Sequence, residues 1–564
     1  MKNNVKKILV VVFILGIIGS TASLSLARRE IAPYDNVIVL VPDGCNQNIQ
    51  TLARWYSDES LVLDNMVSGT VSTYMANSII TGSAAAATAF ATGHKTTVRF
   101  LGVGPRTYDT LTGFEPTAAP YAPVASVLEG SKLKGKAVGL IATSRITHAT
   151  PAAYACHIHD RGMDNEIMEN MVYEDVDVVF GGGFRHLIND TDSYTTTFGD
   201  TWNGKRTDGQ NLYQVLIDRG YNFVDNKDDM NALTSGPVWG LFDDSHMDPE
   251  MDRETLHPTQ PSLADMTAKA IQLLSKDSEG FFLMVEGSQI DWAGHANDPA
   301  YMVTDFIEFD EAVEVAVNFA KSDKRTLVLA FPDHNTGGMT LGNYGPGASY
   351  TDVTYEELVD PLKGMTMSST ALAGEVNDLS ISEIKGAILT YWNIDISDIS
   401  AQKILDLEPV VGLSTAIAHI VSMEYTHVGW TTFGHNGGDV PLWSYSSHPG
   451  KGFSGVSGHY DNTELAYLAA EAIGVDLDST TGELFIELTD QYDWEIEDPS
   501  SDDPVIFIQL ANGNEARINA GSDIIEINGS TYTQLKGIVV YAPITGQVWI
   551  PKDGWNYLEA YSFN

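Results

Sequence analysis

Short apolar runs recur along the first 330 residues of the chain, and each is long enough to form one β-strand. The run at Asn36–Val41 (NVIVLV) is almost wholly apolar, as expected of a strand that is buried on both faces. Similar runs follow at Ala137–Ala142, Val176–Phe180, Phe281–Val285 and Thr326–Phe331. Helical stretches such as Ser262–Leu274 and Asp305–Ala320 lie between these runs. The alternation predicts an α/β fold, a three-layer sandwich around a large, mainly parallel sheet.

The pattern changes near Asp478. The next segment, residues 479–504, is acidic and rich in turn residues, so we interpret it as a linker. Short β runs come after it at Val505–Leu510, Ile524–Ile527 and Ile538–Tyr541, with hairpin signals at Asn512-Gly513 and Asn528-Gly529. We therefore predict that residues 505–564 form a small all-β appendage for packing or anchoring, without catalytic residues.

The N-terminus has the three parts of a secretory signal. A basic head, MKNNVKK, precedes an apolar run at Ile8–Ile18, and small residues follow as far as Ala27. The 11 residues of the apolar run are too few to span a bilayer comfortably. The sequence thus predicts a signal peptide at residues 1–27 and an exported protein (periplasmic, extracellular or at the cell surface), without stable membrane insertion after cleavage. The alternative is an anchor that stays uncleaved.

The charge of the chain limits its partners. It has 564 residues, of which 75 are acidic and 32 are basic, for a formal net charge of −43. Such a surface repels nucleic acid and anionic lipid, so nucleic acid is excluded as a binding partner. An anionic substrate is also repelled, and a site for one would need local cations or metal ions. With only Cys45 and Cys156, the fold cannot depend on a disulfide framework.

Acidic residues stand where three of the predicted strands end. Asp43 follows the first strand and Glu286 ends another, and the pair Asp333-His334 follows a third. A single acid at such a place usually caps a helix. Three acidic strand ends, two of them joined to histidines, instead favour a metal site, because functional sites in such folds lie at the carboxyl ends of the strands.

A second pair of metal-binding side chains lies in the segment VEGSQIDWAGHAND. Asp291 and His295 are four residues apart and would share one face of a helix, so one ion could bind both. Carboxylate and imidazole ligands together suit zinc or a similar metal.

The segment NSIITGSAAAATAFATGHKT, residues 77–96, is nearly free of charge, and Ser83 stands in it before four alanines. Either this is a tightly packed buried helix, or Ser83 must be approached closely by something large and charged. Small side chains would let a helix N-terminus reach a phosphate, which its free N–H groups and dipole favour. A neighbouring dication would lower the pKa of the Ser83 hydroxyl and make it a nucleophile.

Seven segments occur in the order of one known family: VPDG, TGSAAAATAFATGHKT, HATPAA, FGGG, VEGSQIDWAGHAND, PDH and WTTFGHNGGDVPLW. They cover about Asn36–Asp476, and the set resembles alkaline phosphatase, the metal-dependent phosphomonoesterase of bacteria and animals. The resemblance implies a catalytic domain at residues 28–478, with an insertion at about 343–429 that caps the site or joins a dimer interface. It also implies a homodimer that hydrolyses small-molecule phosphate monoesters through a phosphoserine intermediate.

The resemblance assigns roles residue by residue, with Ser83 as the nucleophile and Arg161 as the residue that grips phosphate. It implies two zinc ions and one magnesium ion. Their ligands would be Asp291, His295 and His435 for the first zinc, Asp43, Asp333 and His334 for the second, and Asp43, Thr150 and Glu286 for the magnesium. His148 and Trp292 occupy neighbouring positions that vary among relatives. His148 would flank the magnesium or contact phosphate through water, and Trp292 would line the pocket mouth.

One position departs from the family pattern. Gly82 stands where the family usually has an aspartate, directly before the nucleophile. Because that carboxylate normally restrains the arginine, we expect Arg161 to be looser here. Phosphate would then bind less tightly or leave sooner.

Other functions remain open. Phosphodiesterases and nucleotide pyrophosphatases of the same superfamily commonly lack the magnesium site and the arginine, whereas Thr150, Glu286 and Arg161 are all present. A sulfatase needs a C/S-x-P-x-R context, which Ser83-Ala84-Ala85 does not offer. A non-catalytic surface binding protein would suit the β appendage, but the complete ligand set argues against it. We therefore predict an exported alkaline phosphatase that scavenges phosphate.

Overall fold

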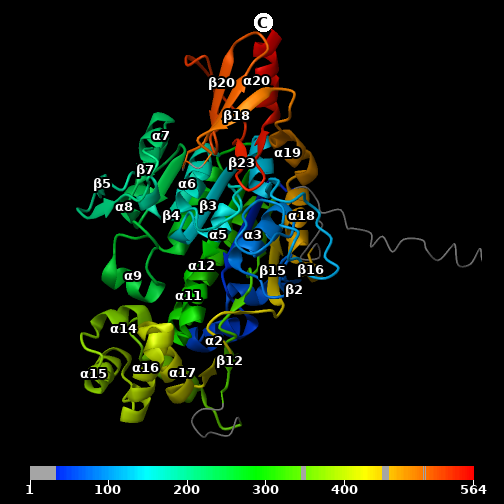
Figure 1. Cartoon of the computed structure of the whole chain (residues 1–564). Helices are drawn as coiled ribbons and strands as arrows, with labels where there is room; N and C mark the ends of the chain where they lie inside the picture. Colours follow the sequence, from blue (N-terminus) through cyan, green and yellow to red (C-terminus); the bar gives the residue numbers. More distant parts are fainter. Residues whose placement is uncertain (1–33, 344–350, 448–455, 500, 502, 564) are drawn as a thin grey trace, which may run out of the picture. The chain divides into compact units, whose positions relative to one another are not determined.

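The computed structural model describes residues 34–343, 351–447, 456–499, 501 and 503–563, which belong to one compact unit. The predicted signal peptide, residues 1–27, lies outside the described residues. A sheet of ten strands forms the centre of the fold (Figure 1). Its strands are, in spatial order, β16 (Gly458–Asp461), β2 (Val67–Ser72), β15 (Val440–Ser446), β10 (Thr326–Ala330), β1 (Asn36–Pro42), β9 (Phe281–Gly287), β3 (Ala137–Arg145), β4 (Val178–Gly182), β8 (Val238–Leu241) and β7 (Asn222–Val224).

The central sheet is mainly parallel, as predicted. Neighbouring strands from β10 through β1, β9, β3, β4 and β8 to β7 all run parallel, whereas β15 is antiparallel to both β10 and β2. All five strands expected from the apolar runs are present. Every residue of β1 is buried, which explains why its sequence shows no alternation of apolar and polar positions.

Helices cover the sheet in two sets. The first set comprises α2 (Gln47–Ser57), α10 (Leu263–Leu274) and α12 (Pro299–Asp323), and α12 contacts both of the others. The second set comprises α3 (Ser83–Thr92), α4 (Val127–Leu133) and α18 (Asn462–Ala472), and α18 contacts both of the others. These sets are the outer layers of the predicted three-layer sandwich (Figure 1). Among the described helices, none combines the length and the apolar character needed to cross a membrane.

The insertion expected at about 343–429 is helical. Its helices are α13 (Tyr355–Lys363), α14 (Ser369–Glu375), α15 (Ile381–Trp392), α16 (Asp398–Val411) and α17 (Leu413–Tyr425). Buried side chains such as Ile388, Trp392 and Ile417 belong to the same apolar cluster as the residues of α12. Helix α17 also contacts α11 (Gln289–Ala296), where His419 Nδ1 lies 2.9 Å from Asn297 Oδ1 at the end of the helix. The insertion is thus packed directly against a helix that carries candidate metal ligands.

The linker predicted at residues 479–504 is wrong, because this segment has regular structure. It contains most of α19 (Leu477–Leu484), then β17 (Ile486–Glu487) and β18 (Asp493–Glu497). In β18, acidic residues alternate with Trp494 and Ile496, which pack against the core of the C-terminal sheet. The acids that suggested a linker are the solvent-facing positions of a strand.

The C-terminal residues form small antiparallel sheets, as expected, but they are not all-β. The larger sheet has the order β18-β19-β20-β21-β22 and the smaller one β17-β24-β23. The added strands are β19 (Val505–Gln509), β20 (Glu515–Asn519), β21 (Ile524–Ile527), β22 (Thr531–Gln534), β23 (Val540–Ala542) and β24 (Gln547–Ile550). Helix α20 (Lys552–Phe563) completes this part and corrects the prediction. Leu558 of this helix is buried against the sheet, which explains its apolar and aromatic face.

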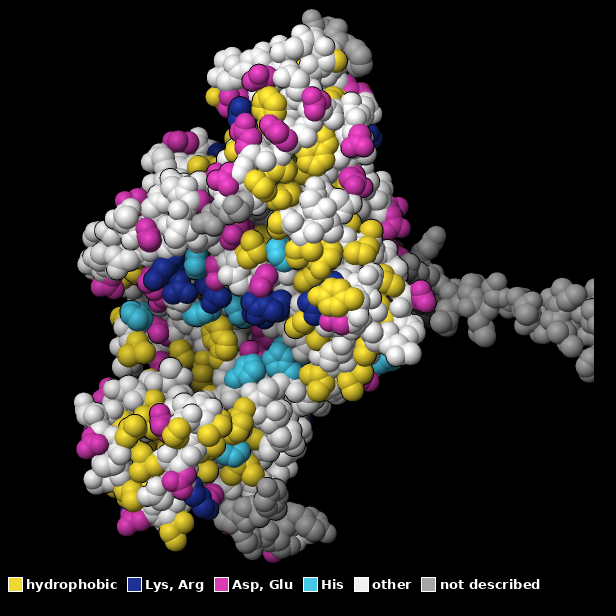
Figure 2. Space-filling view, in the orientation of Figure 1, with side chains coloured by type: hydrophobic (Ala, Val, Ile, Leu, Met, Phe, Trp, Pro, Cys, Tyr) yellow, Lys and Arg dark blue, Asp and Glu magenta, His cyan; other side chains and the backbone are white. Residues whose placement is uncertain are grey.

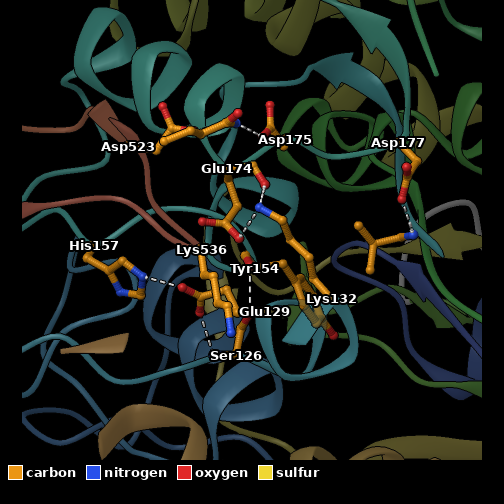
Figure 3. A network of polar contacts seen from close by, with 12 residues as sticks. Ser126, Glu129, Lys132, Tyr154, His157, Glu174, Asp175, Asp177, Asp523 and Lys536 are labelled. Atoms are coloured by element: carbon orange, nitrogen blue, oxygen red, sulfur yellow. Dashed lines mark hydrogen bonds and ion pairs between the residues drawn. The ribbon is translucent and has the colours of Figure 1, made fainter. Parts of the chain in front are cut away.

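Polar and apolar contacts join the C-terminal sheets to the rest of the chain. Arg219 donates to Asp175 (2.6 Å) and to Asp523 on the C-terminal side (2.5 Å). Figure 3 shows Asp175 and Asp523 near two other ion pairs, in which Lys132 points toward Glu174 and His157 toward Glu129. One apolar cluster also spans the junction, with Ala125 and Leu484 on one side and Ile538, Val540 and Trp549 on the other.

Candidate active site and metal-binding groups

The acidic strand ends lie side by side, as the sequence predicted. Strands β10, β1 and β9 are neighbours, with Val41 opposite Glu286 and Pro42 opposite Gly287. Asp43, Glu286 and Asp333 are at most 1% exposed. The carboxyl edge of the sheet therefore holds three carboxylates out of water, which requires compensating positive charge.

The described residues contain three groups of side chains that could hold a metal ion. The groups are Asp291, His295 and His435; Asp43, Asp291 and His334; and Asp43, His148 and Glu286. The first is the set implied for one zinc. The second has Asp291 in place of Asp333, although Asp333 Oδ2 lies only 2.9 Å from His334 Nε2. The third has His148 in place of Thr150.

The first group has a geometry that favours a cation. His295 Nδ1 lies 2.6 Å from the carbonyl of Phe433, and His435 Nδ1 lies 2.8 Å from the carbonyl of Thr81. A carbonyl can only accept, so each Nδ1 carries the proton and each Nε2 presents a lone pair. The two Nε2 atoms are 3.2 Å apart, and Asp291 lies beside both. Converging lone pairs of this kind fit a metal ligand set, with the carbonyls orienting the rings.

The buried carboxylates near Asp43 also lack protein partners. Both oxygens of Asp43, together with Thr150 Oγ1 and Glu286 Oε1, are buried without a hydrogen bond to any described residue. Burial, and then the charges of Asp333, Asp291 and Glu286, raise the pKa of Asp43 well above its usual value. A cation in contact with these oxygens would remove this penalty. The donor atoms therefore fit divalent metal ions.

Thr336, which sequence reasoning missed, orients two of these ligands. It lies in β11 (Asn335–Thr336), which pairs with β14 (His435–Asn436), so that Thr336 is opposite His435. Its hydroxyl donates to Asp291 Oδ1 (2.5 Å) and lies 3.2 Å from His334 Nδ1. A threonine has no sequence signal for such a role, because the contact depends on how the loops fold together.

Ser83 is the first residue of α3 and is buried at this site. All ten residues of the helix are buried, which the small side chains permit, and Gly82 before it provides no side-chain cap. Ser83 Oγ lies 3.1 Å from His334 Nε2. The first N–H groups of α3 therefore remain available to an anion that reaches the hydroxyl.

Arg161 reaches the site through His148. Its Nη2 donates to His148 Nε2 (2.6 Å), and burial lowers its pKa although Asp43 and Asp291 oppose this effect. His148 and Trp292 are in contact, with ring centroids 5.6 Å apart. The predicted site residues are thus brought together in one region, and Figure 2 shows arginine and lysine side chains gathered beside histidines on this face.

His246 is a second residue that sequence reasoning missed. Its ring lies 4.3 Å from that of Trp292 and 5.8 Å from that of His148. His246 comes after the carboxyl end of β8, where functional residues of such folds lie. The apolar run Val238–Leu241 is therefore the sequence signal that could have indicated it.

The α/β sandwich and the grouped carboxylates, imidazoles and serine define a metal-binding hydrolase. Comparison with known proteins then specifies its kind. The alkaline phosphatase family model matches residues 34–475, and the chain is 34% identical to alkaline phosphatase 3 of Bacillus subtilis, over 79% of this chain and 91% of that protein. The chain belongs to the alkaline phosphatase family and is a phosphomonoesterase, which confirms the resemblance seen in the sequence.

Solved structures agree with this assignment. The alkaline phosphatase of Thermus thermophilus superposes with a TM-score of 0.69 at 27% identity, covering 81% of this chain and 95% of that one. A variant of the alkaline phosphatase of the Antarctic bacterium TAB5, solved with magnesium bound, superposes with a TM-score of 0.55 at 25% identity, covering 79% of this chain and 99% of that one.

Proposed function

We propose that the chain is an exported alkaline phosphatase that hydrolyses phosphate monoesters through a phosphorylated Ser83, with two zinc ions and one magnesium ion. The observation that supports this most directly is the position of Ser83 Oγ, 3.1 Å from His334 Nε2 and next to buried oxygens without protein partners. Divalent cations bound there would supply Lewis-acid stabilisation of negative charge on the oxygens around phosphorus.

The proposed ligand sets follow the family pattern. They are Asp291, His295 and His435 for one zinc, Asp43, Asp333 and His334 for the other, and Asp43, Thr150 and Glu286 for magnesium. The unpaired Thr150 and Glu286 oxygens support the third set, as does the magnesium bound in the histidine-to-aspartate variant of the TAB5 enzyme. His148 belongs to a group with Asp43 and Glu286, which supports its place beside the magnesium.

The residues at the site have separate roles in the proposed reaction. Ser83 Oγ loses its proton and attacks phosphorus, the bond from phosphorus to the ester oxygen breaks as the Oγ–P bond forms, and the leaving group takes up a proton and departs as the alcohol. The first N–H groups of α3 and the planar guanidinium of Arg161 hold the remaining phosphate oxygens. His148 accepts from Arg161 Nη2 and so positions the guanidinium. Water then cleaves the Oγ–P bond and releases phosphate.

Turnover of p-nitrophenyl phosphate tests the proposal. The metal-loaded chain should hydrolyse this ester much faster than bis-p-nitrophenyl phosphate, lose activity after chelation, and regain it with zinc and magnesium. Ser83→Ala should reduce turnover by about 10³-fold or more, and mass spectrometry of acid-quenched wild type should find phosphate on Ser83. Ser78→Ala, in the same segment, is the matched control. Full turnover by Ser83→Ala would reject the proposal, and an inert metal-loaded chain would favour a non-catalytic binding protein.

Export, dimerisation and biological role are further parts of the proposal. The N-terminal pattern supports export, and the family supports a homodimer and a phosphate-scavenging role. We also propose residues 28–478 as the catalytic domain, with the helical insertion as a cap or a dimer contact. Light scattering of the purified chain would measure its mass directly, and a monomer would remove the dimer from the proposal.

A further inference from the structure

The strand ends beside the catalytic site differ in charge from those that carry the metal ligands. Strands β10, β1 and β9 end in carboxylates, whereas the next strands in the sheet, β3, β4 and β8, lead to Arg145, Arg185 and His246. In a chain with net charge −43, this concentration of basic side chains at one edge of the sheet needs a reason.

Arg145 and His246 are in direct contact, and the loop that carries Arg185 packs against both segments. The backbone N–H of Arg145 donates to His246 Nδ1 (3.1 Å), and Arg145 Nη1 lies 2.6 Å from His246 Nε2. The backbone N–H of Arg185 donates to the carbonyl of Asp244 (3.2 Å), two residues before His246. A Cβ added at Gly183 would meet Arg145 Cβ at 2.9 Å, so the loop after β4 lies directly on Arg145. The three strand ends therefore form one basic group.

Arg185, within this group, has no carboxylate partner among the described residues. Among the arginines that the structure describes, nine form ion pairs with a carboxylate, whereas Arg161 and Arg185 form none. Arg185 is partly buried, and its Nε donates only to His186 Nε2 (3.2 Å). The nearby Asp164 already accepts from Arg145 Nε and from Thr147. Burial, and then the charges of Arg145 and Arg185, lower the pKa of His246 to about 3, so that its ring is neutral near pH 7.

The basic group is continuous with the catalytic site. His246 contacts Trp292 and His148, and His148 in turn accepts from Arg161, the residue proposed to hold the scissile phosphate. His246 thus links the loop contacted by Arg185 to the residue proposed to hold the scissile phosphate.

We propose that Arg185, with Arg145 and His246, forms a second anion subsite that binds another phosphate or carboxylate on the leaving group of the substrate. The inference rests on the proposed function and names its substrate class: phosphate monoesters that carry a second anionic group. A guanidinium with unused donors suits both kinds of anion.

Equilibrium binding separates this inference from the proposed function. With zinc and magnesium present, the Ser83→Ala chain should bind fructose 1,6-bisphosphate at least about tenfold more tightly than fructose 6-phosphate by calorimetry. A second pair, 3-phosphoglycerate and glycerol 3-phosphate, tests a carboxylate as the second anion. Adding Arg185→Ala should remove most of either preference, and Arg185→Lys should restore part of it.

The control variant is Arg325→Ala, which removes the same charge at the amino end of β10, where Arg325 is 49% exposed and pairs with Asp35. It should keep the preference. Equal affinity for the members of both pairs, or an equal loss for all four ligands in Arg185→Ala, would overturn the subsite. Failure of p-nitrophenyl phosphate turnover would count against the proposed function alone, because the binding measurement does not require turnover.

Discussion

Gly82 leaves open space beside the nucleophile. A Cβ added there meets no heavy atom within 4 Å, and its φ of −112° suits any residue, so Gly82→Asp should fold normally. The new carboxylate would accept from the first turn of α3 and be available to restrain Arg161. We expect phosphate to inhibit Gly82→Asp at a concentration about threefold or more lower than in wild type, because a restrained arginine loses less freedom on binding.

Gly82→Ala separates the carboxylate from the added methyl group. It should leave phosphate inhibition close to that of wild type. The same inhibition constant in Gly82→Asp and wild type would show that the missing carboxylate has no part in phosphate affinity.

Glu169, at another buried position, should make stability depend on pH. It lies in α6 (Asp164–Tyr173), and burial raises its pKa to about 8, although Gln210 donates to it. A glutamate in the unfolded chain has a pKa of about 4.3. Between about pH 4.3 and pH 8 the native state therefore keeps a proton on Glu169 that the unfolded state has lost. The free energy of unfolding then falls as the pH rises through this range. Glu169→Gln should raise the free energy of unfolding by about 1 to 3 kcal/mol at pH 9 and change it little near pH 4.

Urea denaturation at both pH values measures this effect. Glu254→Gln, whose side chain is 82% exposed, is the control and should unfold like wild type at either pH. A gain for Glu169→Gln that is the same at pH 4 and pH 9 would contradict the linkage.

At the scale of elements, the short ladder between β11 and β14 determines how the metal ligands face one another. It places Thr336 opposite His435 and brings the Thr336 hydroxyl to Asp291 on α11. Thr336→Val keeps the shape of the side chain but removes this hydrogen bond. We expect metal affinity to fall by about 10- to 100-fold, as for other residues that orient metal ligands.

Metal content during titration with a chelator is the measurement, since it does not depend on turnover. Thr340→Val in β12 (Thr340–Leu341) is the control, because its exposed hydroxyl donates only to the carbonyl of Gly342. If both variants release metal at the same chelator concentration as wild type, Thr336 has no such role.

The sequence predicted those parts of the site that depend on single elements. Buried strands place Asp43, Glu286 and Asp333 at one edge of the sheet, and helical spacing places Asp291 beside His295. By contrast, His435 and Arg161 are far in sequence from the other site residues, so their positions in the site depend on the tertiary fold. Only the family resemblance indicated that they belong to it. The local sequence pattern also gives no indication of the role of Thr336, because its contacts with the metal ligands depend on the tertiary fold.

The C-terminal prediction failed for a different physical reason. Residues 493–497 carry acids at alternate positions, and a high acidic content suggested a solvated linker. The intervening Trp494 and Ile496 have strand periodicity, which composition alone hides. Helix α20 was missed because its aromatic residues also suit strands.

At the scale of the whole molecule, the junction at Ile538 leads us to expect that the C-terminal sheets unfold together with the rest of the chain. Ile538 packs with Leu484 and Ala125 in the cluster that spans the junction, and Arg219 joins Asp175 to Asp523 across it. Ile506 lies instead inside the core of the C-terminal sheet. Replacing either isoleucine by alanine removes about 2 to 5 kcal/mol of packing.

If the C-terminal sheets were an independent module, Ile506→Ala would shift a separate calorimetric transition and leave the rest of the chain unchanged. Because the two parts share an apolar cluster and ion pairs, we expect both variants to lower the Tm of one common transition. Loss of phosphatase activity on heating should follow that transition in each variant, since the catalytic residues belong to the same cooperative structure. A second transition that moves alone in Ile506→Ala would instead show that the junction contacts are too weak to couple the two parts.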